Sequence, residues 1–170
     1  YNESIDFAGK AITIESTNGS DETVIDGDFP GLDRSLVTFD SAEGQGSVLR
    51  GFTIRNGTIG TLNEQFGTNE GGALFCENAS PIIEACIFTA NAVDFGGAIY
   101  VRGGAPTIEN CDFFTNEALF DGGAILFAQS SGSINDCDLE GNDAGQNGGA
   151  IHMFDGTPSI SACEIRDNAS

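Results

Sequence analysis

The side chains that could support chemistry in this chain of 170 residues are a few carboxylates, one histidine and five cysteines. Glu70, Asp94 and Asp121 lie just before Gly-Gly pairs, and paired carboxylates can act as acid and base in sugar hydrolysis or bind calcium. Asn147 lies at the same place in a further copy, and this mixture is more typical of turn residues than of a catalytic set. His152 is the only histidine, so a metal cluster or a serine or cysteine triad would lack its base. We therefore predict that the protein is not an enzyme and requires no cofactor.

The cysteines comprise an isolated Cys76 and a set that recurs every 25 or 26 residues: Cys86, Cys111, Cys137 and Cys163. Each member of the set stands two residues before a large apolar residue, a strand spacing that turns both side chains to the same side. We interpret the set as small buried hydrophobes, because free cysteines commonly pack in this way. Their stacking distance does not by itself exclude a disulfide, so the redox state and compartment are left open.

The recurring cysteines belong to a unit that is written four times between Gly71 and Asn168. Each copy opens with Gly-Gly-Ala and an aliphatic residue, and later carries an isoleucine, the cysteine, a large apolar residue and an asparagine at fixed spacings. A repeat of this length indicates a solenoid or an array. The isoleucines are Ile83, Ile108, Ile134 and Ile160, and the asparagines are Asn91, Asn116, Asn142 and Asn168.

The apolar runs inside each unit are short and alternating, as at 99–101, which is the period of a strand. Turn residues separate the runs, and no stretch has the length and spacing of an amphipathic helix. The pattern predicts an all-β fold, a parallel β-helix in which like residues stack on like residues. The isoleucine and the cysteine are three residues apart and both should point inward, so a bend must separate them. The stacked asparagines should form a hydrogen-bonded ladder at the following turn.

The length suits a single domain, residues 1–170, of about six rungs. Residues 1–57 are expected to form two irregular rungs, residues 58–70 a longer loop, and residues 71–170 the four repeats. Long loops often carry binding function, although a tolerated insertion is the simpler interpretation of this one.

Two sets of motifs resemble known families. The Gly-Gly-Ala-Ile elements, with the Phe-x-x-Asn elements at 88–91 and 113–116, resemble the repeats of the chlamydial polymorphic membrane proteins. Segments 9–14 and 51–54 resemble the opening rungs of pectate-lyase-like β-helices in secreted bacterial proteins. These resemblances imply a right-handed, single-stranded β-helix with an extracellular or bacterial cell-surface location and a role in adhesion. Because such opening rungs normally continue upstream, they also imply a segment of a longer β-helix.

Pectate-lyase-like enzymes carry their sites on the outward face of the first strands. Here that face offers Glu77 and Arg102, but neither a carboxylate cluster nor a calcium-and-base set. It presents instead an apolar stripe that is our candidate face for a ligand or partner: Phe75, Tyr100, Leu126 and His152, with Phe154 beside it. This stripe could stack on sugar rings or bind a protein, or a loop or neighbouring domain could cover it.

The formal charge is −20, from 6 basic and 26 acidic residues. Such a surface repels nucleic acid and anionic membranes, so neither is expected as a partner. No run of the sequence is apolar enough for direct membrane insertion. The acidity has two interpretations that stay open: solubility, or a surface that binds calcium weakly.

Together these observations predict a non-catalytic extracellular scaffold for adhesion or structure, with a protein or polysaccharide as its partner. Neither end of the chain carries a helix or polar loop to cover the stack, so we also expect end-to-end self-association into filaments. The alternative is a β-helix that binds or degrades polysaccharide and whose catalytic rungs lie outside this chain.

Overall fold

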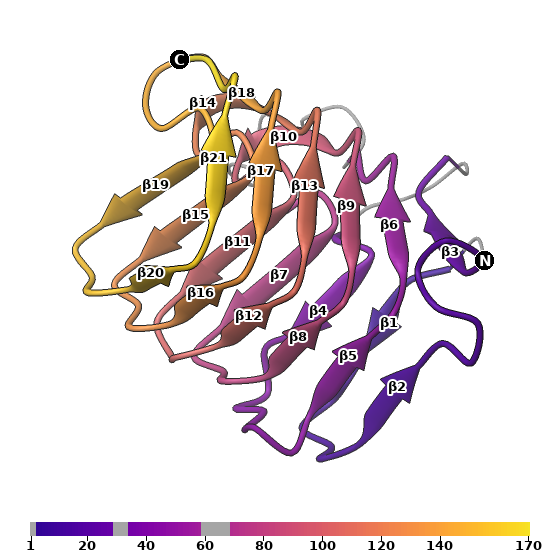
Figure 1. The fold of residues 1–170 in the computed structure, drawn as a ribbon. Helices are drawn as coiled ribbons and strands as arrows, with labels where there is room; N and C mark the ends of the chain where they lie inside the picture. Colours follow the sequence, from indigo (N-terminus) through magenta and orange to yellow (C-terminus); the bar gives the residue numbers. More distant parts are fainter. Residues whose placement is uncertain (1–2, 29–33, 59–68) are drawn as a thin grey trace.

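The computed structural model describes residues 3–28, 34–58 and 69–170. Most of the predicted loop at 58–70 therefore lies outside the described residues. Those residues form 21 strands and no helix, so none of their segments is a helix that could cross a membrane. Figure 1 shows the strands stacked side by side from one end of the molecule to the other.

Three parallel sheets of six strands and a smaller sheet of three strands make up the fold. The first sheet contains β1 (Ile5–Asp6), β4 (Val37–Phe39), β7 (Leu74–Glu77), β11 (Ile99–Arg102), β15 (Ile125–Ala128) and β19 (Ile151–Phe154). The second contains β2 (Thr13–Glu15), β5 (Val48–Arg50), β8 (Ile82–Glu84), β12 (Thr107–Glu109), β16 (Ser133–Asn135) and β20 (Ser159–Ser161). The third contains β3 (Val24–Asp26), β6 (Thr53–Arg55), β9 (Ile87–Thr89), β13 (Asp112–Phe114), β17 (Asp138–Glu140) and β21 (Glu164–Arg166). The fourth contains β10 (Ala92–Phe95), β14 (Glu117–Asp121) and β18 (Asp143–Ala144).

Each pass of the chain visits the first, second and third sheets and then returns to the first, one strand further along. Six such passes make six rungs, which confirms the predicted all-β parallel β-helix. The register keeps equivalent residues together, so that Ile108 of β12 pairs with Ile83 on one side and Ile134 on the other. Because neighbouring strands lie about 4.8 Å apart, one residue type is repeated up each column.

The Gly-Gly pairs are explained by the turn that leads into the first sheet. The first glycine of a pair has a left-handed backbone, with φ of 61° at Gly96, where a side chain would be strained. The second has no room for a side chain, because a Cβ on Gly97 would collide with the carbonyl oxygens of Gly123 and Glu117. The packing of one rung on the next therefore requires both glycines.

The predicted bend between the second and third sheets falls on one residue per repeat in the left-handed conformation. The φ angles are 51° at Ala85, 52° at Asn110, 54° at Asp136 and 53° at Ala162. This bend interrupts the alternation of the strand, so that Ile83 and Cys86 are both buried although they are three residues apart.

The asparagine ladder lies at the turn that follows the third sheet. The Asn116 amide donates to Oδ1 of Asn142 at 2.9 Å and to the carbonyl oxygen of Phe88 at 3.0 Å. Its own Oδ1 accepts hydrogen bonds from Nδ2 and the backbone N–H of Asn91, at 2.9 and 3.2 Å. The ladder ends at Asn168, which accepts from Asn142 and is only partly buried. The amides thus satisfy turn backbone in the interior of the stack.

The core is one continuous column of inward side chains, in which Cys76, Cys86, Cys111 and Cys137 are buried and Cys163 is partly buried. All five thiols are free, and burial raises the pKa of Cys76 to about 12.

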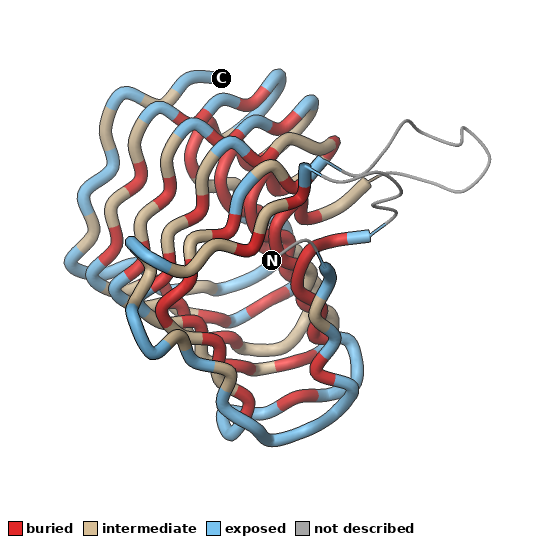
Figure 2. The backbone as a smooth tube through the Cα atoms, turned by 90° about the vertical axis from the view of Figure 1, so that its right-hand side faces the viewer, coloured by how far each residue is buried: buried red, intermediate tan, exposed pale blue. Residues whose placement is uncertain are grey.

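The last rung differs from those below it. Met153, Ile160 and Ile165, which the strand period predicts to be inward and buried, are 41%, 38% and 48% exposed. They occupy inward columns of the last rung that the described residues form. Figure 2 shows the contrast between the buried middle rungs and the exposed last one.

Candidate ligand-binding groove

The predicted apolar stripe is a column of the first sheet. Tyr100 pairs in register with Phe75 and Leu126, and Leu126 pairs with His152. The expectation that the whole column is exposed needs correction, because Tyr100 and Leu126 are only 7% and 4% exposed. Phe75 and His152 are partly buried, and Phe154, two residues after His152, is 56% exposed.

A groove of about 390 Å³ runs beside this column. Phe95, the last residue of β10, lines it together with Tyr100, Leu126 and Phe154. Phe95 also packs against Phe120 of β14, with ring centroids 5.1 Å apart. The fourth sheet therefore forms a flank of the groove. Within the column, the rings of Phe75 and Tyr100 stack with their centroids 6.0 Å apart.

The carboxylates before the Gly-Gly pairs form the polar part of the groove. Glu70, Phe95, Asp121 and Asn147 follow one another in a single column of parallel pairs. Asp94 does not belong to this column; it is buried and accepts a hydrogen bond from the Asn69 N–H at 3.0 Å. Glu70 and Asp121 are two rungs apart, or about 9.6 Å along the stack. Both line the groove, with the aromatic ring of Phe95 between them in the column.

Arg102 fixes the position of Glu70. Its Nη2 lies 2.7 and 2.9 Å from the two carboxylate oxygens of Glu70, and its Nη1 lies 3.2 Å from Glu77. The same guanidinium donates to the Tyr100 hydroxyl at 3.3 Å and stands 5.4 Å from the centre of the Tyr100 ring. Burial raises the pKa of Tyr100 and outweighs the opposing hydrogen bond from Arg102, so the phenol stays protonated and polar at neutral pH.

His152 and Asp121 form the second polar group. Nδ1 of His152 lies 3.5 Å from Oδ1 of Asp121, and the side chains are 24% and 18% exposed. Asn147 donates to the same carboxylate oxygen at 2.7 Å. Nδ1 of His152 is buried and has no hydrogen-bond partner among the described residues, because its contact with Asp121 misses hydrogen-bond geometry. A protonated imidazole would nevertheless form an ion pair with Asp121.

The groove offers hydrogen-bond acceptors next to aromatic rings. Within residues 3–28, 34–58 and 69–170, no group of three or more histidine, cysteine or acidic side chains is arranged to hold a metal ion. Four residues of the predicted stripe line the groove: Tyr100, Leu126, His152 and Phe154. Phe95 and Asp121 join them from the ends of β10 and β14, and Glu70 joins them from an isolated bridge to Phe95. Their shared position directly before each Gly-Gly pair is the signal that could have grouped them.

Residues 32–170 match the family described as the right handed beta helix region, which spans five of the six rungs. No curated protein and no solved structure matches the chain. The narrower resemblances to chlamydial polymorphic membrane proteins and to pectate-lyase-like proteins stay predictions. The stack of parallel sheets and this match agree, and the chain belongs to the right-handed β-helix family.

Proposed function

We propose that the protein is a non-catalytic extracellular scaffold that binds a polysaccharide in the groove beside the first sheet. The observation that carries this proposal is the combination of the rings of Phe95, Tyr100 and Phe154 with the carboxylates of Glu70 and Asp121 in one groove. Its volume of about 390 Å³ falls in the range of small-molecule sites.

A sugar ring has an apolar face of C–H groups and a rim of hydroxyl groups. Aromatic rings provide a large apolar surface for the face, and carboxylates accept hydrogen bonds from the rim. Phe154 is well placed for the first role because more than half of its surface is exposed. Asp121 is suited to the second because Asn147 holds its carboxylate in place.

The net charge narrows the ligand class. A chain with a formal charge of −20 repels anionic polysaccharides at long range. Within the groove, Arg102 is already surrounded by Glu70, Glu77 and the Tyr100 hydroxyl, so its charge is largely compensated. Neutral sugars or sugars with a free amine are therefore the favoured class.

The groove is better suited to binding than to cleavage. A hydrolase needs one carboxyl group that is free to act as an acid and one that is free to act as a base, and neither Glu70 nor Asp121 is free in this sense. Both carboxylate oxygens of Glu70 are engaged by Arg102, so they are not free to act on a substrate. Asp121 and His152 are in contact with each other, so they do not flank a bond from opposite sides. Polysaccharide cleavage would then depend on rungs outside this chain.

The proposal is tested by titrating the protein with neutral oligosaccharides and chitosan oligomers in a calorimeter. Phe154→Ala should weaken binding about tenfold, as expected for one stacked ring. Leu119→Ala is the matched control, because Leu119 is 57% exposed and does not line the groove. If no oligosaccharide binds, or if the two variants bind alike, the proposal is wrong. Release of sugar products during the titration would contradict its non-catalytic part.

A further inference from the structure

Four cysteines form a continuous column at the edge of the third sheet. Each stands one residue before a strand of that sheet: Cys86, Cys111, Cys137 and Cys163. The backbone N–H that follows each of the last three donates to the carbonyl oxygen of the cysteine one rung earlier, at 2.9, 3.1 and 2.9 Å. The four residues are therefore in register, one on each of four successive rungs.

The sulfur atoms of the column lie close to the neighbouring rung. Sγ of Cys111 is 3.5 Å from the backbone nitrogen of Cys86, and Sγ of Cys137 is 3.4 Å from the backbone nitrogen of Cys111. Burial raises the pKa of Cys111, and hydrogen bonding with the thiols of Cys137 and Cys86 raises it further. Thiols of neighbouring rungs therefore interact directly inside the core.

Neighbouring cysteines are within reach of a disulfide. In-register residues on neighbouring strands are about 4.8 Å apart, and a disulfide spans about 4.4–6.8 Å between Cα atoms. The Cβ atoms of a disulfide are usually about 3.5–4.5 Å apart, so a small approach of two rungs would close the bond. Cysteines two rungs apart are separated by about 9.6 Å, which is too far. Only one pairing of the four joins neighbours throughout, namely Cys86 with Cys111 and Cys137 with Cys163.

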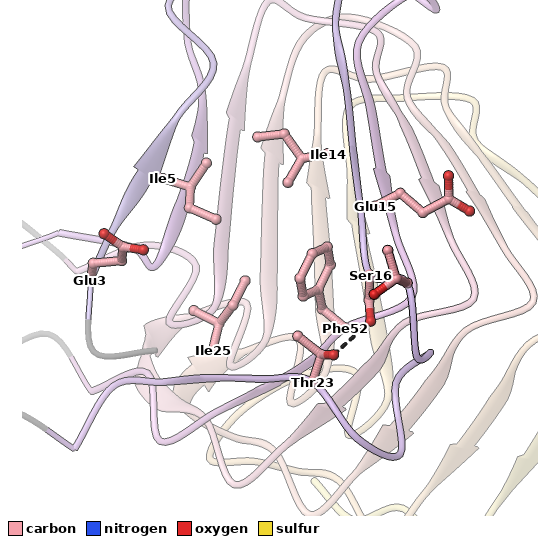
Figure 3. A pocket seen from close by; sticks show the side chains of 9 residues that line it. Glu3, Ile5, Ile14, Glu15, Ser16, Thr23, Ile25 and Phe52 are labelled. Atoms are coloured by element: carbon pink, nitrogen blue, oxygen red, sulfur yellow. Dashed lines mark hydrogen bonds between the residues drawn. The ribbon is translucent and has the colours of Figure 1, made fainter.

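Packing alone does not require cysteine in this column. The same column holds Thr23 in the first rung and Phe52 in the second, where the same backbone hydrogen bonds connect the rungs. Figure 3 shows both side chains at a cavity of about 290 Å³, with the Thr23 hydroxyl hydrogen-bonded to that of Ser16. The column thus accommodates side chains of different size and polarity, whereas every rung of the four repeats places a thiol there.

Cys76 provides a control within the same chain. It is fully buried, like the interior members of the column, but it lies in the first sheet. Its in-register neighbours are Phe39 and Val101. Cys76 therefore shares the burial of the column and lacks a thiol on either neighbouring rung.

We propose that the column is a site of covalent cross-linking between rungs, in which an oxidising environment joins Cys86 to Cys111 and Cys137 to Cys163. The structure describes the reduced column, with all five thiols free. A low-molecular-weight disulfide such as oxidised glutathione is the oxidant. One protein thiolate attacks it and releases a glutathione thiolate, and the neighbouring thiolate then attacks the mixed disulfide and releases the second. Two electrons pass to the oxidant, and the two protons lost by the protein thiols go to the released glutathione.

The bonds would form while the chain folds, because the folded core shields the interior thiols from the oxidant. Each bond would then hold two rungs together in addition to their hydrogen bonds. It would also close a loop of about 25 residues in the unfolded chain and so restrict the unfolded state. None of the five cysteines lines the groove, so this inference does not depend on the proposed binding of polysaccharide.

Refolding from urea in a glutathione redox buffer tests the pairing. Free thiols are blocked with N-ethylmaleimide in denaturant, and a protease that cleaves after glutamate places the five cysteines in five different peptides. Mass spectrometry without reduction should find peptide 85–109 linked to 110–117 and peptide 118–140 linked to 141–164, with maleimide on Cys76 alone. Any other pattern overturns the proposal, including label on all five cysteines or a bond to Cys76.

Two variants and a stability measurement extend the test. Cys111→Ala should keep the bond between Cys137 and Cys163 and leave Cys86 labelled, whereas Cys76→Ala should keep both bonds. The urea midpoint of the oxidised parent should exceed that of the same protein reduced with dithiothreitol by at least about 1 M, because each closed loop restricts the unfolded chain. Equal midpoints would show that the bonds do not hold the rungs together and would contradict the proposal.

Discussion

Replacement of Asn116 by leucine removes the central amide of the ladder without changing the branching of the side chain. Asn116 is 1% exposed, so water cannot replace the bonds that are lost. The carbonyl oxygen of Phe88 and the backbone N–H of Asn91 would each lose a hydrogen bond. We therefore expect a loss of stability from a change that keeps the number and branching of the side-chain atoms.

The magnitude follows from these two backbone groups. An unsatisfied buried polar group costs about 1–3 kcal/mol, so the two together cost about 2–6 kcal/mol. Burial of the leucine side chain gives back about 1–2 kcal/mol. The midpoints leave a net loss of about 2.5 kcal/mol, within a range of about 0–5 kcal/mol, and the central value lowers the melting temperature of a chain of this length by about 5–10 °C.

Urea unfolding followed by circular dichroism measures this loss of stability. The same substitution at two other asparagines provides the comparison. Asn168→Leu alters the partly buried end of the same ladder, where water can reach the freed groups, so the loss should be about 1 kcal/mol. Asn147→Leu alters an exposed asparagine and should cost no more than about 0.5 kcal/mol. If Asn116→Leu were as mild as Asn147→Leu, the ladder would not be the structural element that its hydrogen bonds suggest.

Three further predictions concern the turns, the acidic surface and the thiols. Gly97→Ala should lower the melting temperature by more than about 10 °C because its Cβ collides with backbone of the next rung, whereas Gly44→Ala, with open space around it, should have little effect in the same calorimetric scan. Burial, and after it the charge of Asp138, raises the pKa of Asp112. Ionisation of Asp112 therefore destabilises the folded state, and the stability increases as the pH falls through that raised pKa. Asp112→Asn should accordingly stabilise the protein by about 0.5 kcal/mol at pH 7 and not at pH 3, and an equal gain at both pH values would contradict this. Iodoacetamide at pH 8 should label Cys163 before the buried thiols, as followed by peptide mass spectrometry, and equal labelling of all five cysteines in the folded protein would show that the column is open.

The rungs could be predicted from the sequence because the same packing constraints apply at equivalent positions of every repeat. Ile108 must stack on Ile83 and Ile134, and a glycine at position 97 must leave room for the next rung. Each such constraint restricts the residue type at its position, so the columns of the structure appear as a repeat in the sequence. Even the bend at Ala85 follows from two inward residues that are three apart.

The groove could not be predicted in the same way. The strand period predicts that Tyr100 and Leu126 point outward, yet both are buried. They share the groove with Phe95, which comes from a different sheet. The column of the flank holds Glu70, Phe95, Asp121 and Asn147, four different side chains. No core restricts the residue type there, so the sequence repeats the position before each Gly-Gly pair but repeats no residue type at it.

The direction of the hydrogen bonds between rungs has a mechanical consequence. The two ends of the chain lie at opposite ends of the stack, and the sheets are joined by bonds that run along the stack from rung to rung. A force that pulls the ends apart would open these bonds one row at a time, as a zipper opens, instead of shearing many rows at once. Each released repeat of about 25 residues would add roughly 80 Å of extended chain. Under tension the molecule should therefore lengthen in regular steps at modest force. Each step dissipates mechanical energy, so the molecule would dampen a sudden pull along the stack.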